Sequence, residues 1–178
     1  RTEFASWYGR FLQIMAKEDA FTRLIEALKV LPNVGPKTAQ RMAYQLLQNN
    51  RDGALLLQQA LADALAAVRH CRLCNTLCES EVCELCADTG RRDDVLMIVH
   101  HPVDVSSMEA AHCHDGHYFV LMGYVNPTQG MDLNQIAIRQ LVERLQTSHI
   151  TEIIIATNFT AEGDATAYVI HQLLKDLP

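Results

Sequence analysis

The sequence is divided by two cysteine pairs, His70-Cys71-Arg72-Leu73-Cys74 and Val82-Cys83-Glu84-Leu85-Cys86. Two Cys-x2-Cys pairs with eight residues between them have the ligand spacing of a tetrahedral zinc site. The alternatives are free thiols or the disulfides of a secreted domain, but a doubled pair is among the more specific sequence signals for zinc. Because four thiolates leave no open coordination position, we expect one structural zinc ion per chain, with the ligands Cys71, Cys74, Cys83 and Cys86.

The segment that holds the cysteine pairs is short and polar, so it buries little apolar surface by itself. Zinc would have to stabilise it, with a contribution on the order of 10–16 kcal/mol. A fifth cysteine, Cys78, lies inside this segment. We interpret it as a spare thiol, and an alternative ligand is the other interpretation that the spacing allows.

The composition is that of a globular protein. The chain has 178 residues, 49% of them apolar, which suits one domain or two small modules. No stretch approaches the roughly 20 apolar residues that a membrane-spanning helix needs, and residues 1–14 mix charged and aromatic side chains, unlike a signal peptide. We therefore expect a cytoplasmic protein without membrane contact, where reduced thiols favour a metal over disulfides.

Charge is distributed unevenly along the chain. Residues 1–90 hold ten basic and ten acidic side chains, whereas residues 91–178 hold five basic and eleven acidic ones. The second half thus carries the whole net charge of −6. We expect any nucleic-acid contact in the first half, while the acidic second half suits a protein partner or a hard cation better.

Before the cysteines, apolar residues recur at intervals of three and four, which predicts helices at 21–31, from Pro36 onward, and at 53–68. The first two are joined by a compact turn, Leu31-Pro32-Asn33-Val34-Gly35-Pro36-Lys37. Proline suits the first position of a helix, and Gly35 permits an unusual backbone angle. The sequence therefore predicts two helices that meet at a tight corner.

The start of the second helix is a candidate anion site, because its first amides and its dipole favour negative charge. Lys37 and Arg41 lie one turn apart beside it and would contact successive phosphates. The turn resembles the helix-hairpin-helix motif, which binds DNA backbones without reading sequence. Asn33 stands where that motif usually has a glycine, and Asn tolerates the left-handed conformation best among other residues. The alternative is an ordinary helical corner with two solvated cations.

After the cysteines, strands and helices alternate. Continuous apolar runs predict strands at 95–99, 118–122 and 153–156, and amphipathic segments predict helices at 102–111, 134–145 and 164–174. Such alternation favours a parallel sheet with helices on its faces, and function in such sheets lies at the carboxyl ends of the strands. Those ends carry His100, His101, Asp104, Gly123, Tyr124, Glu162 and Asp164.

Other chemistries have weaker signals. Neither a dinucleotide-binding fingerprint nor a P-loop is present. Glu162 and Asp164 could hold a divalent cation, although such pairs are more often solvated loop charges. The cluster of His112, Cys113, His114 and His117 is interpreted as a polar loop, because no second ligand pair frames it.

Taken together, the chain resembles the RecR family of bacterial recombination mediators along roughly residues 21–174. The resemblance rests on the corner sequence 31–41, the spaced cysteines, and the segments 118–123 and 156–166. It implies an α/β protein with an N-terminal extension at 1–20, a helix-hairpin-helix domain at 21–69, a four-cysteine zinc finger at 70–90 and a Toprim-like parallel α/β domain at 91–178.

The resemblance also implies a function. Members of the family act in recombinational DNA repair, bind single- and double-stranded DNA without sequence preference, and work with RecO to load recombinase on single strands. RecF is a further candidate partner, and a nucleoid-associated location in a bacterial cytoplasm is implied. We expect Glu162 and Asp164 to face a basic surface of RecO. The family forms rings, so we expect a dimer or ring tetramer, with the helix at 21–31 as an interface element.

The sequence departs from the family where Ile98-Val99-His100 replaces Val-Val-Glu, so the glutamate of the Toprim site is absent. The chain also stops at Pro178, whereas the family continues with residues that complete its fold and subunit contacts. The rival functions are a metal-dependent phosphoryl-transfer enzyme and a zinc-stabilised protein-interaction module. Because magnesium prefers carboxylate oxygens and imidazole is a poor ligand for it, we expect no enzyme activity.

Overall fold

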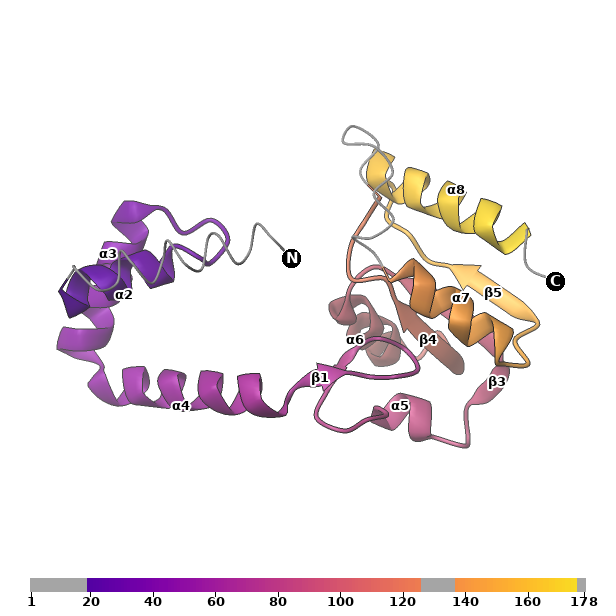
Figure 1. Ribbon diagram of the computed structural model, residues 1–178, viewed down its shortest axis with the longest axis horizontal. Coiled ribbons are helices and arrows are strands. Elements are labelled where there is room, and N and C mark those ends of the chain that lie inside the picture. The colour runs from indigo at the N-terminus through magenta and orange to yellow at the C-terminus, as the bar shows by residue number, and fades with distance from the viewer. Residues whose placement is uncertain (1–18, 126–136, 176–178) are drawn as a thin grey trace. The chain divides into compact units, whose positions relative to one another are not determined.

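The structure, a computed structural model, describes residues 19–125 and 137–175. The chain forms two compact units, Arg1–Ala66 and Ala67–Pro178 (Figure 1). The predicted N-terminal extension lies almost entirely outside the described residues, as do the first residues of the helix predicted at 134–145.

The first unit is helical, as the spacing of its apolar residues predicted. Its elements are α2 (Ala20–Leu28), α3 (Pro36–Tyr44), the π-helix η1 (Gln45–Asn49) and α4 (Arg51–Ala67). The carboxylate of Asp19 caps α2, because it accepts hydrogen bonds from the amides of Phe21 and Thr22 at 2.9 and 3.1 Å.

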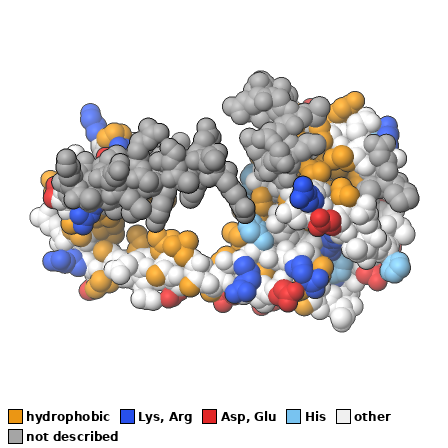
Figure 2. All heavy atoms as spheres, in the orientation of Figure 1, with side chains coloured by type: hydrophobic (Ala, Val, Ile, Leu, Met, Phe, Trp, Pro, Cys, Tyr) orange, Lys and Arg blue, Asp and Glu red, His pale blue; other side chains and the backbone are white. Residues whose placement is uncertain are grey.

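Helices α2 and α3 pack closely because small residues lie between them. Ala39 and Ala43, four positions apart on α3, are fully buried, and the rings of Phe21 and Tyr44 lie 4.9 Å apart at the same contact. Among described residues of this unit, no others are buried. Helix α4 has no buried residue, and Figure 2 shows hydrophobic side chains at the surface along it.

The corner between α2 and α3 has one residue in the left-handed conformation, and it is not the glycine. Gly35 is the N-cap of α3 and has ordinary extended angles, φ −81° and ψ 173°, so it does not use the unusual angles that glycine permits. The left-handed residue is Asn33, with φ 64°, which confirms why Asn is tolerated at that position. One left-handed residue is enough to reverse the chain, and Gly35 can then lead straight into the helix.

The second unit begins with the cysteine segment and continues as an α/β sheet. The cysteine segment contains the paired strands β1 (Arg69–His70) and β2 (Leu77–Cys78) and the short helix α5 (Glu84–Ala87). The sheet consists of β3 (Arg92–Val99), β4 (Gly116–Val120) and β5 (Glu152–Ile155). The helices that follow these strands are α6 (Pro102–Ala111), α7 (Ile138–Gln146) and α8 (Ala161–Lys175).

All three strands run parallel in the order β4-β3-β5, which confirms the predicted parallel sheet. Strand β3 is central and its residues from Val95 to Val99 are buried, because helices cover both faces of the sheet. The predicted helix at 102–111 has the observed bounds, whereas α8 begins three residues before the predicted start at 164.

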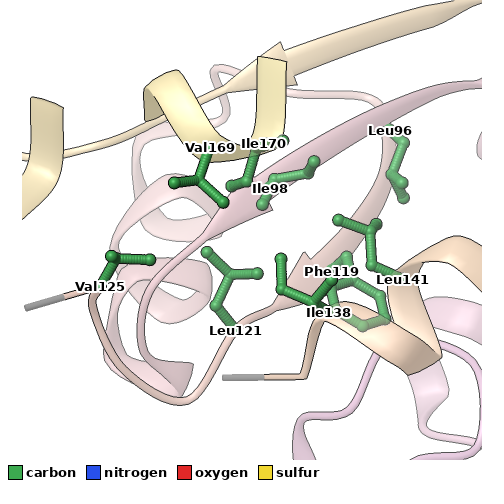
Figure 3. Close-up of a cluster of buried hydrophobic side chains, with 9 residues drawn as sticks. All are labelled: Leu96, Ile98, Phe119, Leu121, Val125, Ile138, Leu141, Val169 and Ile170. Atoms are coloured by element: carbon green, nitrogen blue, oxygen red, sulfur yellow. The ribbon is translucent and has the colours of Figure 1, made fainter. Parts of the chain in front are cut away.

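Each face of the sheet has its own core. On one face, α7 and α8 cover the strands, and Figure 3 shows their side chains directed at those of the sheet. This core contains Leu96, Ile98, Phe119, Leu121, Val125, Ile138, Leu141, Val169 and Ile170. On the other face, Val105 of α6 packs against Met97, Val99, Tyr118 and Val120. The alternation of buried residues along β3 and β4 produces both cores.

The cysteine segment packs against the outer edge of β4. Val120 donates its backbone N–H to the carbonyl of Cys74 at 2.8 Å, and the side-chain amide of Asn75 donates to the carbonyl of Val120, also at 2.8 Å. These bonds satisfy an edge strand that would otherwise expose unpaired backbone groups. The segments expected as separate domains at 70–90 and 91–178 thus lie together in one compact unit.

Candidate metal and nucleic-acid sites

The four paired cysteines converge on one point. The thiol sulfurs of Cys71, Cys74, Cys83 and Cys86 all lie within 4.8 Å of one another, and those of Cys74 and Cys83 are 3.5 Å apart. Zn–S bonds of about 2.3 Å in a tetrahedron place sulfurs roughly 3.8 Å apart. The four thiols therefore fit a tetrahedral metal ion in both number and spacing.

Backbone hydrogen bonds shape the two turns that present these thiols. In the first turn, Cys71 donates to the carbonyl of Thr76 at 2.7 Å, and Asn75, left-handed with φ 63°, donates to the carbonyl of Cys71 at 2.9 Å. The amide of Cys83 in the second turn donates to the sulfur of Cys71 at 3.3 Å. This N–H···S bond joins the two turns and stabilises negative charge on the sulfur.

The electrostatics of the cluster favour thiolate formation at one ligand. The hydrogen bond from the Cys74 thiol and the nearby Arg144 guanidinium lower the pKa of Cys86 to about 5. The same hydrogen bond, together with burial, raises the pKa of Cys74, and burial raises the pKa of Cys83 to about 11. Metal ligation requires thiolates, so a bound ion would displace the protons of the other thiols.

Cys78 lies outside the group of converging thiols. It belongs to β2, and its thiol donates to the carbonyl of Ser80 at 3.0 Å. This position agrees with its interpretation as a spare thiol.

The N-terminus of α3 is open. No side chain caps it, Pro36 occupies its first turn, and the first helical bond runs from the Ala39 amide to the Gly35 carbonyl at 2.9 Å. Lys37 and Arg41 are exposed, and one turn of helix separates them. The corner therefore offers uncapped amides beside two cations, which is the arrangement that binds phosphate oxygens.

Gly35 is not required by the fold of the corner. Its backbone angles are open to any residue, and a Cβ added there would meet no atom within 4 Å. A glycine that neither conformation nor packing explains is typical of a backbone that a ligand approaches closely.

The carboxyl ends of the strands bring together several predicted residues, but not as a cation site. His100 follows β3, is 1% exposed, and stacks on Tyr124 with ring centres 3.9 Å apart. Its Nδ1 lies 3.0 Å from the carbonyl of Gly123, so Nδ1 carries a proton that it donates. The carboxylate of Asp104 accepts from the His101 amide at 2.8 Å.

This arrangement does not fit the magnesium ion that the Toprim fold implies. Burial lowers the pKa of His100, so the imidazole is neutral at pH 7, and a neutral imidazole is a poor magnesium ligand. Glu162 and Asp164 are exposed in the first turn of α8. Within the described part of the chain, the cysteines form the one group of three or more side chains with metal-binding spacing.

The histidine-rich segment agrees with its interpretation as a polar loop at His112, Cys113 and His114, whereas that interpretation is wrong for His117, which lies half-buried on β4. His112 ends α6 in a left-handed conformation with φ 50°, and Cys113 donates to the carbonyl of Met108 at 3.6 Å. His114 Nε2 lies 3.0 Å from the carbonyl of His117. These contacts are local and orient the loop.

Family models match three consecutive parts of the chain. The RecR helix-hairpin-helix model matches residues 21–65, the model of the RecR zinc finger domain with four cysteines matches residues 68–88, and the Toprim domain model matches residues 94–178. Recombination protein RecR of Neisseria gonorrhoeae (strain NCCP11945) is 60% identical over 162 residues, covering 91% of this chain and 79% of the relative. The chain belongs to the RecR family of recombination proteins.

Two further relatives support the assignment. Recombination protein RecR of Neisseria meningitidis serogroup C (strain 053442) is 59% identical over the same shares of both chains. Recombination protein RecR of Chromobacterium violaceum is 48% identical, covering 91% of this chain and 82% of the relative. The RecR assignment confirms the predicted order of helix-hairpin-helix, zinc-finger and Toprim regions. Within the described residues, no helix is long and apolar enough to cross a membrane.

Sequence reasoning missed one residue that contacts the cysteine cluster, Arg144. It lies on α7, and its guanidinium contacts the cysteine segment from the sheet side. The one available signal was a basic residue in the strongly acidic second half of the chain.

Proposed function

We propose that this RecR-family chain binds DNA phosphates through the corner between α2 and α3 and acts in recombinational repair. The observation that carries the proposal is the uncapped start of α3, where Gly35 leaves space beside the amides and Lys37 and Arg41 are exposed. Contacts with phosphates alone would bind single- and double-stranded DNA without sequence preference. The names of the relatives, which describe recombination proteins, agree with this role.

Zinc is the metal that we propose for the cysteine cluster, at one ion per chain. Four thiolates at tetrahedral spacing favour zinc over magnesium or calcium, which prefer oxygen ligands. The ion would be structural, because all four coordination positions are filled by protein. It would hold the segment that completes the edge of β4.

We propose a RecO-like protein as the partner of the acidic surface at the start of α8, with RecF as a further candidate. Glu162 and Asp164 are both exposed there and point to a basic partner surface. Charge reversal at both should abolish the complex while DNA binding is retained, and reversal of exposed Glu152 on β5 is a control with half the charge change. If the double variant lost DNA binding as well as the RecO-like partner, or kept the partner, this assignment would be contradicted.

One corner offers few phosphate contacts. A dimer or ring would present several corners to the same DNA, so that once one corner is bound the others bind at a high effective concentration. The expected interface helix at 21–31 is half-buried along α2, whereas Val30 and Leu31 beyond its end are exposed. Leu31, Met42 and Leu57 line an apolar groove of about 440 Å³ in the same unit. We therefore extend the proposed interface to α3 and α4. Light scattering over a concentration series tests it, and a strict monomer that binds DNA tightly would contradict it.

Metal-dependent phosphoryl transfer is the weaker candidate. It needs several carboxylates around the metal, and the position that should supply one holds the buried, neutral His100. Magnesium- or manganese-dependent strand cleavage that disappears when Glu162 or Asp164 is changed to Ala would establish it instead.

The DNA-binding proposal is tested by a salt series. Lys37→Ala and Arg41→Ala should each weaken binding equally for unrelated sequences and reduce the slope of log K against log salt by about 0.7–0.9. In the double variant, the slope should fall by the sum of the two single reductions. An unchanged slope in the double variant would show that the corner is structural only.

The control for that series is Arg92→Ala. Arg92 is an exposed cation of the second unit, ion-paired to Asp94 at 2.8 Å. Its removal changes the net charge by the same amount without touching the corner. The slope should stay at the wild-type value, which separates phosphate contacts from a general charge effect.

A further inference from the structure

Arg144 contacts both cysteine turns and the sheet with one nitrogen. Its Nη1 donates to the carbonyl of Leu73, lies 3.4 Å from the carbonyl of Tyr118, and lies 3.9 Å from the sulfur of Cys86. Leu73 lies within the first cysteine pair, Cys86 closes the second, and Tyr118 belongs to β4. The side chain is only half-exposed, so these contacts are partly shielded from water.

The position of Arg144 follows from the packing of α7. Ile138 and Leu141 bury one side of this helix in the sheet core. Arg144 is one turn beyond Leu141, so its side chain runs along the edge of that core toward β4 and the cysteine segment. A helix fixed by the core therefore holds a guanidinium against the metal cluster.

The cluster needs a cation of this kind. A zinc ion with four thiolates carries about two negative charges by valence, and three of the sulfurs belong to buried residues. Buried charge is costly unless it is paired and hydrogen-bonded. The surrounding second half of the chain has five basic and eleven acidic residues, so it supplies little compensation by itself. Arg144 provides both a positive charge and donors at the cluster.

All three acceptors at Arg144, two carbonyls and a sulfur from three separate segments, lie around one guanidinium nitrogen. A guanidinium is always charged and is more weakly hydrated than an ammonium, so it suits a partly shielded site. A lysine ammonium would also bring a charge and donors on one nitrogen but lacks the planar group, so it would keep only part of these contacts.

We infer that Arg144 is a positioning residue for the metal site: its contacts hold the two cysteine pairs in place relative to each other and put a positive charge beside the sulfur of Cys86. This inference rests on the proposed zinc binding by the four cysteines. Hydrogen-bond partners that orient metal ligands commonly contribute about 10–100-fold to metal affinity, and we assign Arg144 an effect of that size. Through Arg144, helix α7 of the Toprim-like region would thus help to hold the cysteine segment.

The test measures metal binding in the full chain. Zinc affinity is measured by competition with a chromogenic chelator for wild type, Arg144→Gln, Arg144→Lys and the control Arg139→Gln. Arg139 is an exposed arginine on the same helix, so its variant carries the same charge change. The cobalt-substituted proteins are compared by absorption spectroscopy, because the sulfur-to-cobalt charge-transfer band reports directly on hydrogen bonding to the thiolates.

The expected result is a zinc affinity about 10–100-fold lower in Arg144→Gln, a shifted charge-transfer band, and no change in Arg139→Gln. Arg144→Lys should recover part of the affinity and carries the test if the Gln variant does not fold. Wild-type affinity and an unshifted band in Arg144→Gln would overturn the inference, even if thermal stability falls, and the same result in Arg144→Lys would also overturn it. A wild-type protein that binds neither metal would instead refute the proposed zinc site.

Discussion

The two units of this chain differ in how their helices are stabilised. In the second unit, the sheet has a core on each face, and α6, α7 and α8 each contribute buried residues. In the described part of the first unit, only Ala39 and Ala43 are buried, and α4 has no buried residue. The second unit thus has the interior of an independent domain, whereas the first offers mainly surface.

This difference assigns the stability of the fold mainly to the second unit and contact with DNA mainly to the first. The second unit buries its apolar runs and encloses a metal-binding cluster, so changes there should affect folding first. The first unit exposes the cations and the open helix start that a phosphate backbone would contact, so changes there should affect binding first. The predictions below test this division, in order of decreasing effect.

Metal removal should have the largest effect, and it should act on the second unit. Zinc bound to such cysteine segments contributes on the order of 10–16 kcal/mol. Chelation, or Cys74→Ser, should therefore unfold the cysteine segment and lower the thermal midpoint, as followed by circular dichroism with metal content measured on the same sample. Cys78→Ser is the matched control and should keep one zinc ion per chain. A metal-free preparation with unchanged thermal stability would contradict the prediction.

Replacing a leucine by alanine should destabilise the protein much more in the second unit than in the first. Leu121 is fully buried in the sheet core, so Leu121→Ala should cost about 2–5 kcal/mol of unfolding free energy. Leu61 on α4 is 58% exposed, and Leu61→Ala should cost no more than about 0.5 kcal/mol. Urea denaturation measures both. Equal losses would show that α4 is packed against a surface of the folded protein.

Mild acid should weaken the second unit through His100. Burial holds the pKa of this imidazole below its ordinary value, although Gly123 and Asp104 act in the opposite direction. As pH falls below about 6.5, the unfolded chain takes up the proton first, so stability decreases with falling pH until the folded-state pKa is reached. His100→Asn keeps a donor for the Gly123 carbonyl but cannot titrate.

The pH effect is measured as the difference between these two proteins. Urea midpoints of wild type and His100→Asn are measured between pH 5 and 7.5. Because only wild type loses stability through the His100 imidazole, the two midpoints should converge at the acidic end. Contributions of the cysteines and of His117, whose pKa is also lowered by burial, are common to both. Parallel curves would contradict the assignment of His100 as a neutral buried group.

Much of this architecture could be predicted from the sequence because it is encoded locally. The apolar run at 95–99 predicted the buried central strand, and the cysteine spacing predicted the cluster of four thiols. Asn33 was correctly expected to tolerate the left-handed conformation. The sequence could not tell whether Gly35 uses the unusual angles that glycine permits, and the structure shows that it does not.

What the sequence did not provide depends on contacts between distant segments. The hydrogen bonds of Val120 to the cysteine turn and the approach of Arg144 to Cys86 join residues far apart in the chain. His100 was placed correctly at the end of a strand, but its stacking on Tyr124 depends on a loop after another strand. No periodicity or spacing rule encodes such contacts.

The central claim is that the corner of the first unit is shaped to bring a phosphate backbone against the start of α3. The most direct test is Gly35→Ala, measured for DNA affinity and for thermal stability on the same protein. The added methyl group meets nothing in the chain, so stability should change by less than about 1 kcal/mol. Hydrogen bonds to charged groups are worth about 1.5–3 kcal/mol, so DNA binding should weaken about tenfold or more. Undiminished affinity in a stably folded Gly35→Ala protein would contradict the claim.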